Sequence, residues 1–497
     1  MNKRVFYFTN IILLLPLIMY GCQFDDESKS DSKTNNTKTE TYDETEASKD
    51  ENIIYTTDKN FSELINTLSH EKKYTITIIG NITSENISEI KQTLKRKDSL
   101  HINLDLSKTT GLTSIEECAF HECHGLISIK LPNTINSIGY CAFSGCTNLT
   151  NIEIPDSVTS ICMGAFEECR KLESIRIPNS ATLGDEVFYN CINLKTFKIS
   201  ENHPDYSTDK TKTMLLSKDK KQLIAYPSAT KDINIPDYIT SIGNFAFSGC
   251  RNLENINFHN HIASIGENAF YDCQKLTNIE LPDSVKQIND GAFSDCENLT
   301  SIKLPANITS INKETFHGCK SLKNITLPNR LESIGEKAFY DCANLINIKI
   351  PDSVKNIGIE AFSGCHNLKE IKLPKSLESI DNRAFYECHS LESITIPDTV
   401  TSIGKSAFSE CTNLKKIKLP KSLTTIKLAL FKGCETLTSV TIPVSVTTIE
   451  KLAFMNCDKL TTINYTGTKE NWGKIEKNLV HNEVLNKVSV NYNYIDK

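Results

Sequence analysis

Residues 338–362 read AFYDCANLINIKIPDSVKNIGIEAF, and the hydrophobic positions of this stretch recur at a fixed spacing along most of the chain. Its first phenylalanine, Phe339, has thirteen counterparts, which lie 23 residues apart within two blocks except for one spacing of 22. A fixed period of this length indicates units that bury their apolar faces by stacking on one another, so the sequence predicts one solenoid. The fourteen positions are Phe120, Phe143, Phe166, Phe188, Phe247, Phe270, Phe293, Phe316, Phe339, Phe362, Phe385, Phe408, Phe431 and Phe454.

Each unit contains a short strand followed by a turn. Leu345, Ile348 and Ile350 form the pattern LxxIxI, whose alternation is typical of a strand, and such strands from successive units would form a parallel sheet. Pro351 has no amide proton and ends the hydrogen-bonded ladder, and Ile357 then supplies the opposite wall. The sequence therefore predicts a leucine-rich repeat solenoid with a parallel β-sheet on the concave wall and short strands and turns on the convex wall.

A small or turn-forming residue follows the isoleucine of the second wall in most units. Glycine, asparagine and aspartate tolerate a positive φ, so a left-handed corner is expected there. The position holds Gly139, Gly184, Gly243, Gly266, Asn289, Asn312, Gly335, Gly358, Asp381 and Gly404.

The order AFxxC followed by LxxIxIP resembles the BspA-like, or Treponema-type, class of leucine-rich repeat found in bacterial surface proteins. The resemblance covers roughly residues 100–466, which would hold about 14 units of 23 residues. It implies an adhesin or protein-binding module for host matrix, host cells or other bacteria. It carries no catalytic motif with it.

The composition excludes several other classes of protein. The net charge of −6 over 497 residues is mild and gives no argument for binding nucleic acid or an anionic membrane surface. The motifs HExxH, GxSxG and GxGxxG are absent, and the eleven histidines have no fixed partner within the period. The sequence predicts neither an enzyme nor a cofactor.

The amino terminus has the pattern of an export signal. Lys3 and Arg4 precede an apolar run over residues 5–19, which predicts a signal peptide over residues 1–21. Gly21 before Cys22 resembles a bacterial lipobox, which implies that Cys22 is lipidated and anchors the protein at the cell surface, in the outer membrane. Ordinary secretion is the alternative.

The regions flanking the repeats differ from them in composition. Residues 22–52 are acidic and almost without apolar side chains, which predicts a disordered tether. Residues 53–99 combine two helical patterns with a strand pattern, and we expect them to cap the first unit; residues 467–497 would cap the last, with Trp472 covering the core. Between the two blocks, residues 200–235 interrupt the period, and we expect a β-hairpin that projects from a turn. It would either bind a partner or brace the solenoid.

One cysteine per unit lies three residues after the phenylalanine, as Cys342 follows Phe339. Stacked units would place these cysteines about 4.8 Å apart with parallel side chains, whereas a disulfide needs Cβ atoms about 3.8 Å apart and turned toward each other. A column of buried thiols is expected, although Cys118 and Cys141, at a second shared position, could pair.

Cys118, His121, Cys123 and His124 lie close enough in sequence to suggest zinc. The opposing interpretation is that Cys123 belongs to the buried column while the histidines flank it on a turn. We favour the second, so no metal site is predicted.

The middle residue of each IxI faces outward and is often basic. This stripe contains seven cations and two acidic residues among fourteen positions although the chain as a whole is acidic, which suggests an acidic partner such as an acidic protein segment or a sulfated glycan. The alternative is that lysine only keeps the sheet soluble, in which case the protein is an inert surface spacer or coat component. The basic positions are Lys130, Arg176, Lys198, Lys303, Lys349, Lys372 and Lys418.

Overall fold

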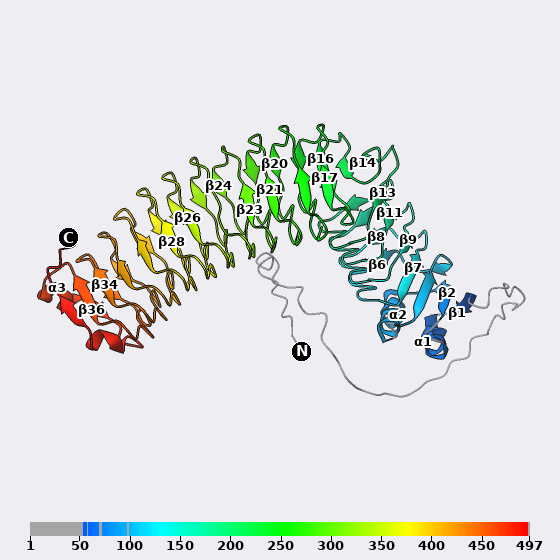
Figure 1. Cartoon of the computed structure of the whole chain (residues 1–497). Coiled ribbons are helices and arrows are strands. Elements are labelled where there is room, and N and C mark those ends of the chain that lie inside the picture. The colour runs from blue at the N-terminus through cyan, green and yellow to red at the C-terminus, as the bar shows by residue number, and fades with distance from the viewer. Residues whose placement is uncertain (1–52, 57, 69–71, 97–98, 496–497) are drawn as a thin grey trace, which may run out of the picture. The chain divides into compact units, whose positions relative to one another are not determined.

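The computed structural model describes residues 53–56, 58–68, 72–96 and 99–495, and the predicted signal peptide and tether lie outside them. In the repeat region the chain forms a stack of turns with strands in two walls (Figure 1). We call the wall that carries the LxxIxI strands the first wall and the opposite one the second wall. Strands of both walls pair in parallel one period apart, as Ile348 does with Ile371 and Ile357 with Ile380. The predicted solenoid of parallel strands is confirmed.

Most first-wall strands are three residues long, with a buried middle residue between two that face outward. This pattern follows from the alternation of side chains along a strand. The strands are β7 (Leu126–Lys130), β9 (Asn151–Glu153), β11 (Ser174–Arg176), β13 (Thr196–Lys198), β17 (Asp232–Asn234), β19 (Asn255–Asn257), β21 (Asn278–Glu280), β23 (Ser301–Lys303), β26 (Asn347–Lys349), β28 (Glu370–Lys372), β30 (Ser393–Thr395), β32 (Lys416–Lys418), β34 (Ser439–Ile442) and β36 (Thr462–Tyr465).

Second-wall strands are two residues long, and their second residue is buried except in β12, where Leu183 is partly exposed. They are β6 (Ser114–Ile115), β8 (Ser137–Ile138), β10 (Ser160–Ile161), β12 (Thr182–Leu183), β18 (Ser241–Ile242), β20 (Ser264–Ile265), β22 (Gln287–Ile288), β24 (Ser310–Ile311), β25 (Ser333–Ile334), β27 (Asn356–Ile357), β29 (Ser379–Ile380), β31 (Ser402–Ile403), β33 (Thr425–Ile426) and β35 (Thr448–Ile449).

Between the walls the repeated phenylalanines form a column. The Phe339 side chain is fully buried, and its ring stacks on Phe316 at a centroid distance of 5.4 Å and on Phe362 at 5.2 Å. Within each block a ring such as Phe339 is therefore packed from both sides by rings of the neighbouring repeats, whereas the rings at the block ends have a stacked phenylalanine on one side only.

The amino-terminal elements extend the first wall in the order β1-β2-β4-β7-β9 and add two helices. Phe61, Ile76 and Ile90 are buried in one core with Phe120 of the first repeat, so this region closes the end of the stack. The elements are β1 (Ile53–Thr56), α1 (Asp58–Thr67), β2 (Lys73–Ile78), β3 (Gly80–Asn81), α2 (Ser84–Arg96), β4 (His101–Asp105) and β5 (Thr109–Thr110).

The interruption near residues 200–235 is built into the second wall. Its strands are β14 (Tyr206–Thr208), β15 (Leu215–Ser217) and β16 (Gln222–Ala225). Strands β15 and β16 pair antiparallel as the predicted hairpin, but β16 also pairs in parallel with β18. The hairpin is therefore part of the second wall and does not project from the solenoid as expected. The reason is apolar packing, because Leu216 and Leu223 are fully buried. Tyr226 occupies the phenylalanine position, with its ring centroid 5.3 Å from that of Phe247.

The prediction of a left-handed corner after the second-wall isoleucine, at the position of Gly358, was wrong. None of the glycines at this position has a positive φ; instead, two other positions in most repeats do, such as Lys337 (φ 53°) and Asp341 (φ 54°). A Cβ added to Gly358 would lie 2.7 Å from the carbonyl carbon of Gly335 and 2.8 Å from the amide nitrogen of Glu336. The neighbouring backbone at Gly358 therefore lies too close for a side chain in this arrangement, although Asn289, Asn312 and Asp381 occupy the same position of other repeats.

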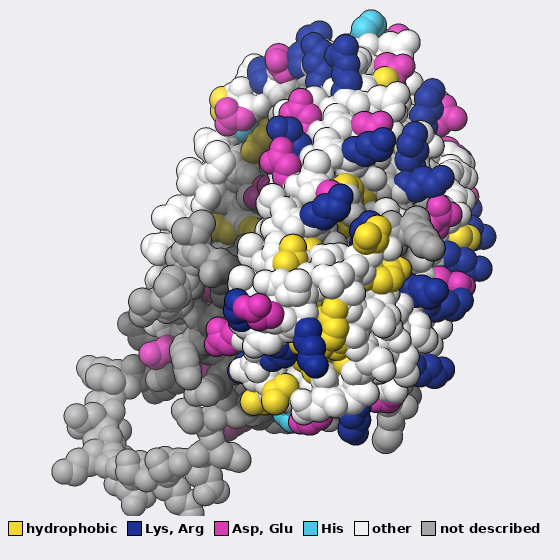
Figure 2. Space-filling view, turned by 90° about the vertical axis from the view of Figure 1, so that its left-hand side faces the viewer, with side chains coloured by type: hydrophobic (Ala, Val, Ile, Leu, Met, Phe, Trp, Pro, Cys, Tyr) yellow, Lys and Arg dark blue, Asp and Glu magenta, His cyan; other side chains and the backbone are white. Residues whose placement is uncertain are grey.

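The carboxy-terminal end is covered by α3 (Lys469–Lys474), β37 (Glu476–Lys477), the 3-10 helix η1 (Glu483–Asn486) and β38 (Ser489–Asn491). Trp472 packs against the core at a centroid distance of 5.2 Å from Tyr465, which supports the role of a cover. Figure 2 looks toward this end and shows apolar side chains as separate small areas among uncharged polar groups, backbone and scattered charged side chains. None of the helices among the described residues combines the length and apolar character needed to cross a bilayer.

Candidate binding surface

All seven predicted basic side chains of the stripe lie exposed on the outward face of the first wall. The ladder register places some of them directly opposite one another: Lys349 faces Lys372, and Arg176 faces Lys198. Like charges at this spacing repel mildly, which is a cost to the sheet that an anionic ligand would offset.

Acidic neighbours neutralise part of the stripe. The Nζ of Lys130 lies 3.5 Å from a carboxylate oxygen of Glu153, and that of Lys372 lies 3.8 Å from one of Glu370. Arg176 pairs with Asp156. Lys198, Lys303 and Lys349 form no ion pair with another described residue, so they are the cations most available to a partner.

The outward position two residues before the stripe is mostly serine, threonine or asparagine, and some of these side chains hydrogen-bond to the neighbouring strand. Asn255 donates to Asp232 at 2.6 Å, and Ser301 Oγ lies 2.5 Å from Asn278 Oδ1. These side chains present amide and hydroxyl groups on the outward face of the first wall. A ligand on this face would rely on charge and hydrogen bonds.

A shallow polar cavity of about 410 Å³ lies where the first wall meets the amino-terminal strands. Lys73, Asn103, Asp105 and Ser128 line it, together with Lys130 of the stripe. Ser128 donates to Asn103 at 2.8 Å, and Asn103 donates to Thr75 at 3.2 Å, so the floor is held in place. Sequence reasoning missed this site, because it did not place β2 beside β4.

Every described cysteine is a thiol, and the column from Cys146 onward shares one contact. The Sγ of Cys342 lies 3.1 Å from the carbonyl oxygen of Phe316 in the preceding repeat, and the Sγ of Cys146 lies 3.0 Å from that of Phe120. Burial raises the pKa of the Cys411 thiol to about 12 and that of Cys342 well above its usual range. The predicted column of buried thiols is present, and the alternative bond between Cys118 and Cys141 does not form.

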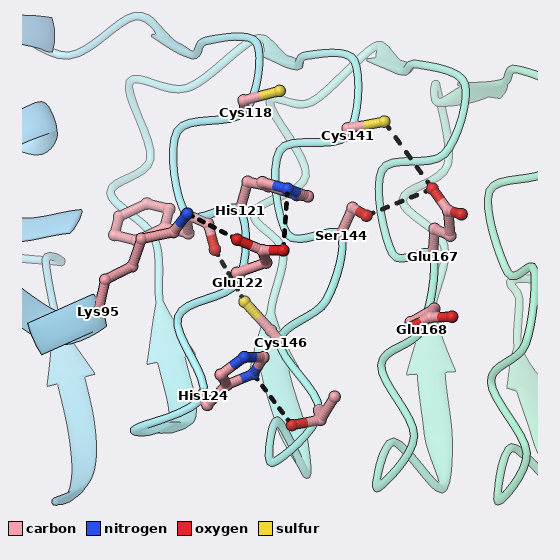
Figure 3. A network of polar contacts seen from close by, with 12 residues as sticks. Lys95, Cys118, His121, Glu122, His124, Cys141, Ser144, Cys146, Glu167 and Glu168 are labelled. Atoms are coloured by element: carbon pink, nitrogen blue, oxygen red, sulfur yellow. Dashed lines mark hydrogen bonds and ion pairs between the residues drawn. The ribbon is translucent and has the colours of Figure 1, made fainter. Parts of the chain in front are cut away.

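The four residues considered for zinc do not converge. Figure 3 shows Cys118, His121 and His124 spread along one turn. His121 Nε2 lies 3.7 Å from a carboxylate oxygen of Glu122, and His124 Nδ1 lies 3.2 Å from Thr147 Oγ1. Burial lowers the pKa of His121, which favours a neutral ring at pH 7.

The same region contains half-buried acidic groups. Glu167 accepts from Ser144 at 3.3 Å, as Figure 3 shows, and burial raises its pKa. Glu186 lies in the next repeat, and burial together with the charges of Glu167 and Asp185 raises its pKa to about 7.

A second network joins the two blocks of repeats across the interruption. Tyr189 donates its hydroxyl to Asp272 at 2.6 Å, and Arg251 Nε donates to the same carboxylate oxygen at 2.7 Å. The ring of Tyr189 passes over Gly249, where a Cβ would lie 2.8 Å from the ring.

The predicted lipidation site, Cys22, lies outside the described residues.

Three solved structures resemble the chain. A leucine-rich repeat protein of Eubacterium ventriosum is 23% identical over 69% of this chain and 91% of its own, with a TM-score of 0.49. A leucine-rich cell surface protein of Faecalibacterium prausnitzii is 27% identical over 73% and 86%, with a TM-score of 0.43. A leucine-rich repeat protein of Bacteroides ovatus is 23% identical over 84% and 87%, with a TM-score of 0.40. No curated protein matches.

The sequence also matches a family model described as the BspA type leucine-rich repeat region, over residues 92–209 and, in overlapping matches, 224–496. These spans include the phenylalanine column, the thiol column and both walls. The chain therefore belongs to the family of BspA-type leucine-rich repeat proteins.

Proposed function

We propose that this protein is an exported, lipid-anchored surface protein that binds an acidic partner along the first wall, as an adhesin for host matrix, host cells or other bacteria. The observation that carries the proposal is the row of exposed cations, of which Lys198, Lys303 and Lys349 form no ion pair among the described residues, although Glu280 lies opposite Lys303 on the neighbouring strand. The hydrogen-bonding side chains beside them would contact a ligand that runs from repeat to repeat.

The chemistry fits a polymer that carries a negative charge at short intervals. First-wall strands are about 4.8 Å apart, so a sulfated glycan or an acidic peptide could meet a cation on successive strands. Each contact is exposed and worth only a few tenths of a kcal/mol, so binding depends on several acting together.

The test compares two probes, heparin for sulfated glycan and poly-glutamate for an acidic peptide. Changing Lys303, Lys349, Lys372 and Lys418 together to Ser should weaken binding of the preferred probe by roughly tenfold, or about 1.4 kcal/mol, and flatten its salt dependence.

The matched control changes four exposed lysines at the second wall and its corners, namely Lys286, Lys355, Lys405 and Lys451, to Ser, which removes the same net charge. If both variants lose affinity equally, the stripe is not the site. If the parent binds neither probe, nor matrix proteins, nor bacterial cells saturably, the protein is an inert spacer instead.

Anchoring is tested separately by metabolic labelling with palmitate. The parent should be labelled and should sediment with membranes, whereas Cys22→Ala should lose both properties. A labelled, membrane-bound Cys22→Ala variant would show that Cys22 is not the lipidation site.

A further inference from the structure

Two histidines of consecutive repeats form a stacked pair. His366 and His389 each follow a column cysteine by one residue, and their rings lie 4.9 Å apart between centroids and 7° from parallel. Both are half-buried, so the pair can be reached from solvent.

Backbone contacts fix the protonation of both rings. The Nδ1 of His366 lies 3.0 Å from the carbonyl oxygen of Glu387, and the Nδ1 of His389 lies 2.9 Å from that of Glu410. A carbonyl oxygen can only accept a hydrogen bond, so Nδ1 carries the proton in each neutral ring. Nε2 then keeps its lone pair, which is the arrangement that orients histidines as metal ligands.

A carboxylate completes the group. One ring nitrogen of each histidine and one carboxylate oxygen of Glu387 lie within 4.8 Å of one another. Ligands around a tetrahedral ion with bonds of about 2.0 Å are about 3.3 Å apart, so the ligand atoms would move together by up to about 1.5 Å on binding. That adjustment is available to half-buried side chains, and it implies moderate affinity.

We propose that His366, Glu387 and His389 bind a divalent transition-metal ion such as Zn²⁺, which would link two consecutive repeats. Two imidazoles and one carboxylate suit ions of intermediate softness better than Ca²⁺ or Mg²⁺, which prefer oxygen. Three protein ligands leave a coordination position for water or for a group on a partner.

The test uses the full mature chain, reduced and freed of metal with a chelator. Calorimetric titration with Zn²⁺ at neutral pH should give one site per chain. The double variant His366→Gln/His389→Gln and the single variant Glu387→Gln should each lose at least tenfold in affinity. His124→Gln is the control, because His124 occupies the same position of its repeat but has Thr147 rather than a histidine beside it.

Titration with Co²⁺ separates this site from the cysteines, since thiolate ligands give an intense near-ultraviolet charge-transfer band that imidazole and carboxylate do not. The expected spectrum lacks the band in the parent. Thermal melting without metal should be the same in parent and variants, so that lost affinity reports lost ligands. The proposal is overturned by the absence of a stoichiometric site, by equal affinity in the double variant, or by a thiolate band.

Discussion

At the scale of the residue, the cysteine column shows how one side chain meets two demands. Cys342 is fully buried among apolar groups, and its thiol still donates to the carbonyl oxygen of Phe316. That oxygen also accepts the amide proton of Cys319 at 3.2 Å. Cysteine is small and apolar enough for the core, and it adds a weak donor.

Burial should keep the column thiols unreactive in the folded protein. Because the pKa of Cys411 is raised to about 12, little thiolate exists at pH 8, and iodoacetamide should leave the column unmodified until the protein is denatured. Mass spectrometry after denaturing alkylation should then find the column cysteines as alkylated thiols. Finding most of them in disulfides would contradict the prediction.

The phenylalanine column should be the most sensitive set of positions. Phe339→Ala should destabilise the protein by about 3–5 kcal/mol, because it leaves a cavity between two rings that are held by their own repeats. Denaturant melts measure this loss, with Lys349→Ser as a nearly neutral control. A loss below about 1 kcal/mol would mean that the column can collapse around the cavity.

Glu186 should make stability depend on pH. Its pKa is raised to about 7 in the folded chain, so the folded state binds a proton that the unfolded state releases near pH 4.3. The stability that the protonated Glu186 gives to the folded chain is therefore fully present below about pH 4.3. It is lost as the pH rises through about 4.3 to about 7, because the folded chain must then keep a proton that the unfolded chain has released, or bury a charge.

Glu186→Gln should therefore be more stable than the parent at pH 8, by up to about 3 kcal/mol, and similar at pH 4. Urea melts at both pH values, with the exposed Glu332→Gln as control, measure the difference. A Glu186→Gln variant that gains nothing at pH 8 would show that the carboxylate is already well solvated.

At the scale of the element, some features could be predicted from sequence and others could not. The spacing of Leu345, Ile348 and Ile350 was sufficient to predict the first-wall strands. The in–out alternation of apolar residues and the 23-residue repeat period both place a strand at these positions. Gly358 was misinterpreted because glycine serves both positive φ and close backbone approach, and sequence does not distinguish them.

The candidate sites likewise divide into those that the sequence predicted and those that it did not. The outward positions of the stripe could be predicted because strand alternation fixes them, and Lys349 opposite Lys372 follows from the period. The pair His366 and His389 was overlooked, although a separation of 23 residues makes them neighbours. The Tyr189–Asp272 bond could not be predicted, since it depends on how the interruption folds.

At the scale of the whole molecule, the stack needs its ends covered. Trp472 is partly buried against the last repeat, and Ile475 and Leu485 are buried there. Removing residues 467–497 should expose this surface and cost of order 4 kcal/mol, at about 1.5–3 kcal/mol for each large apolar side chain.

The measurement is binding of a hydrophobic dye together with the melting temperature, compared with the full chain and with Trp472→Phe as a mild control. The truncated chain should bind more dye and melt earlier. Unchanged melting would indicate that the last repeat is stable without the carboxy-terminal elements.

The repeated contacts also bear on how such a gene can change in length. Because the Cys342–Phe316 contact recurs at nearly every junction from Cys146 onward, removing or duplicating 23 residues between equivalent positions would recreate the same junction. Recombination between neighbouring copies would then shorten or lengthen the protein by whole repeats without disturbing the core. Isolates of one species are expected to differ in the number of repeats within the block from Phe247 to Phe454. The interruption, with its Tyr189–Asp272 bond, is expected to be present once in every isolate.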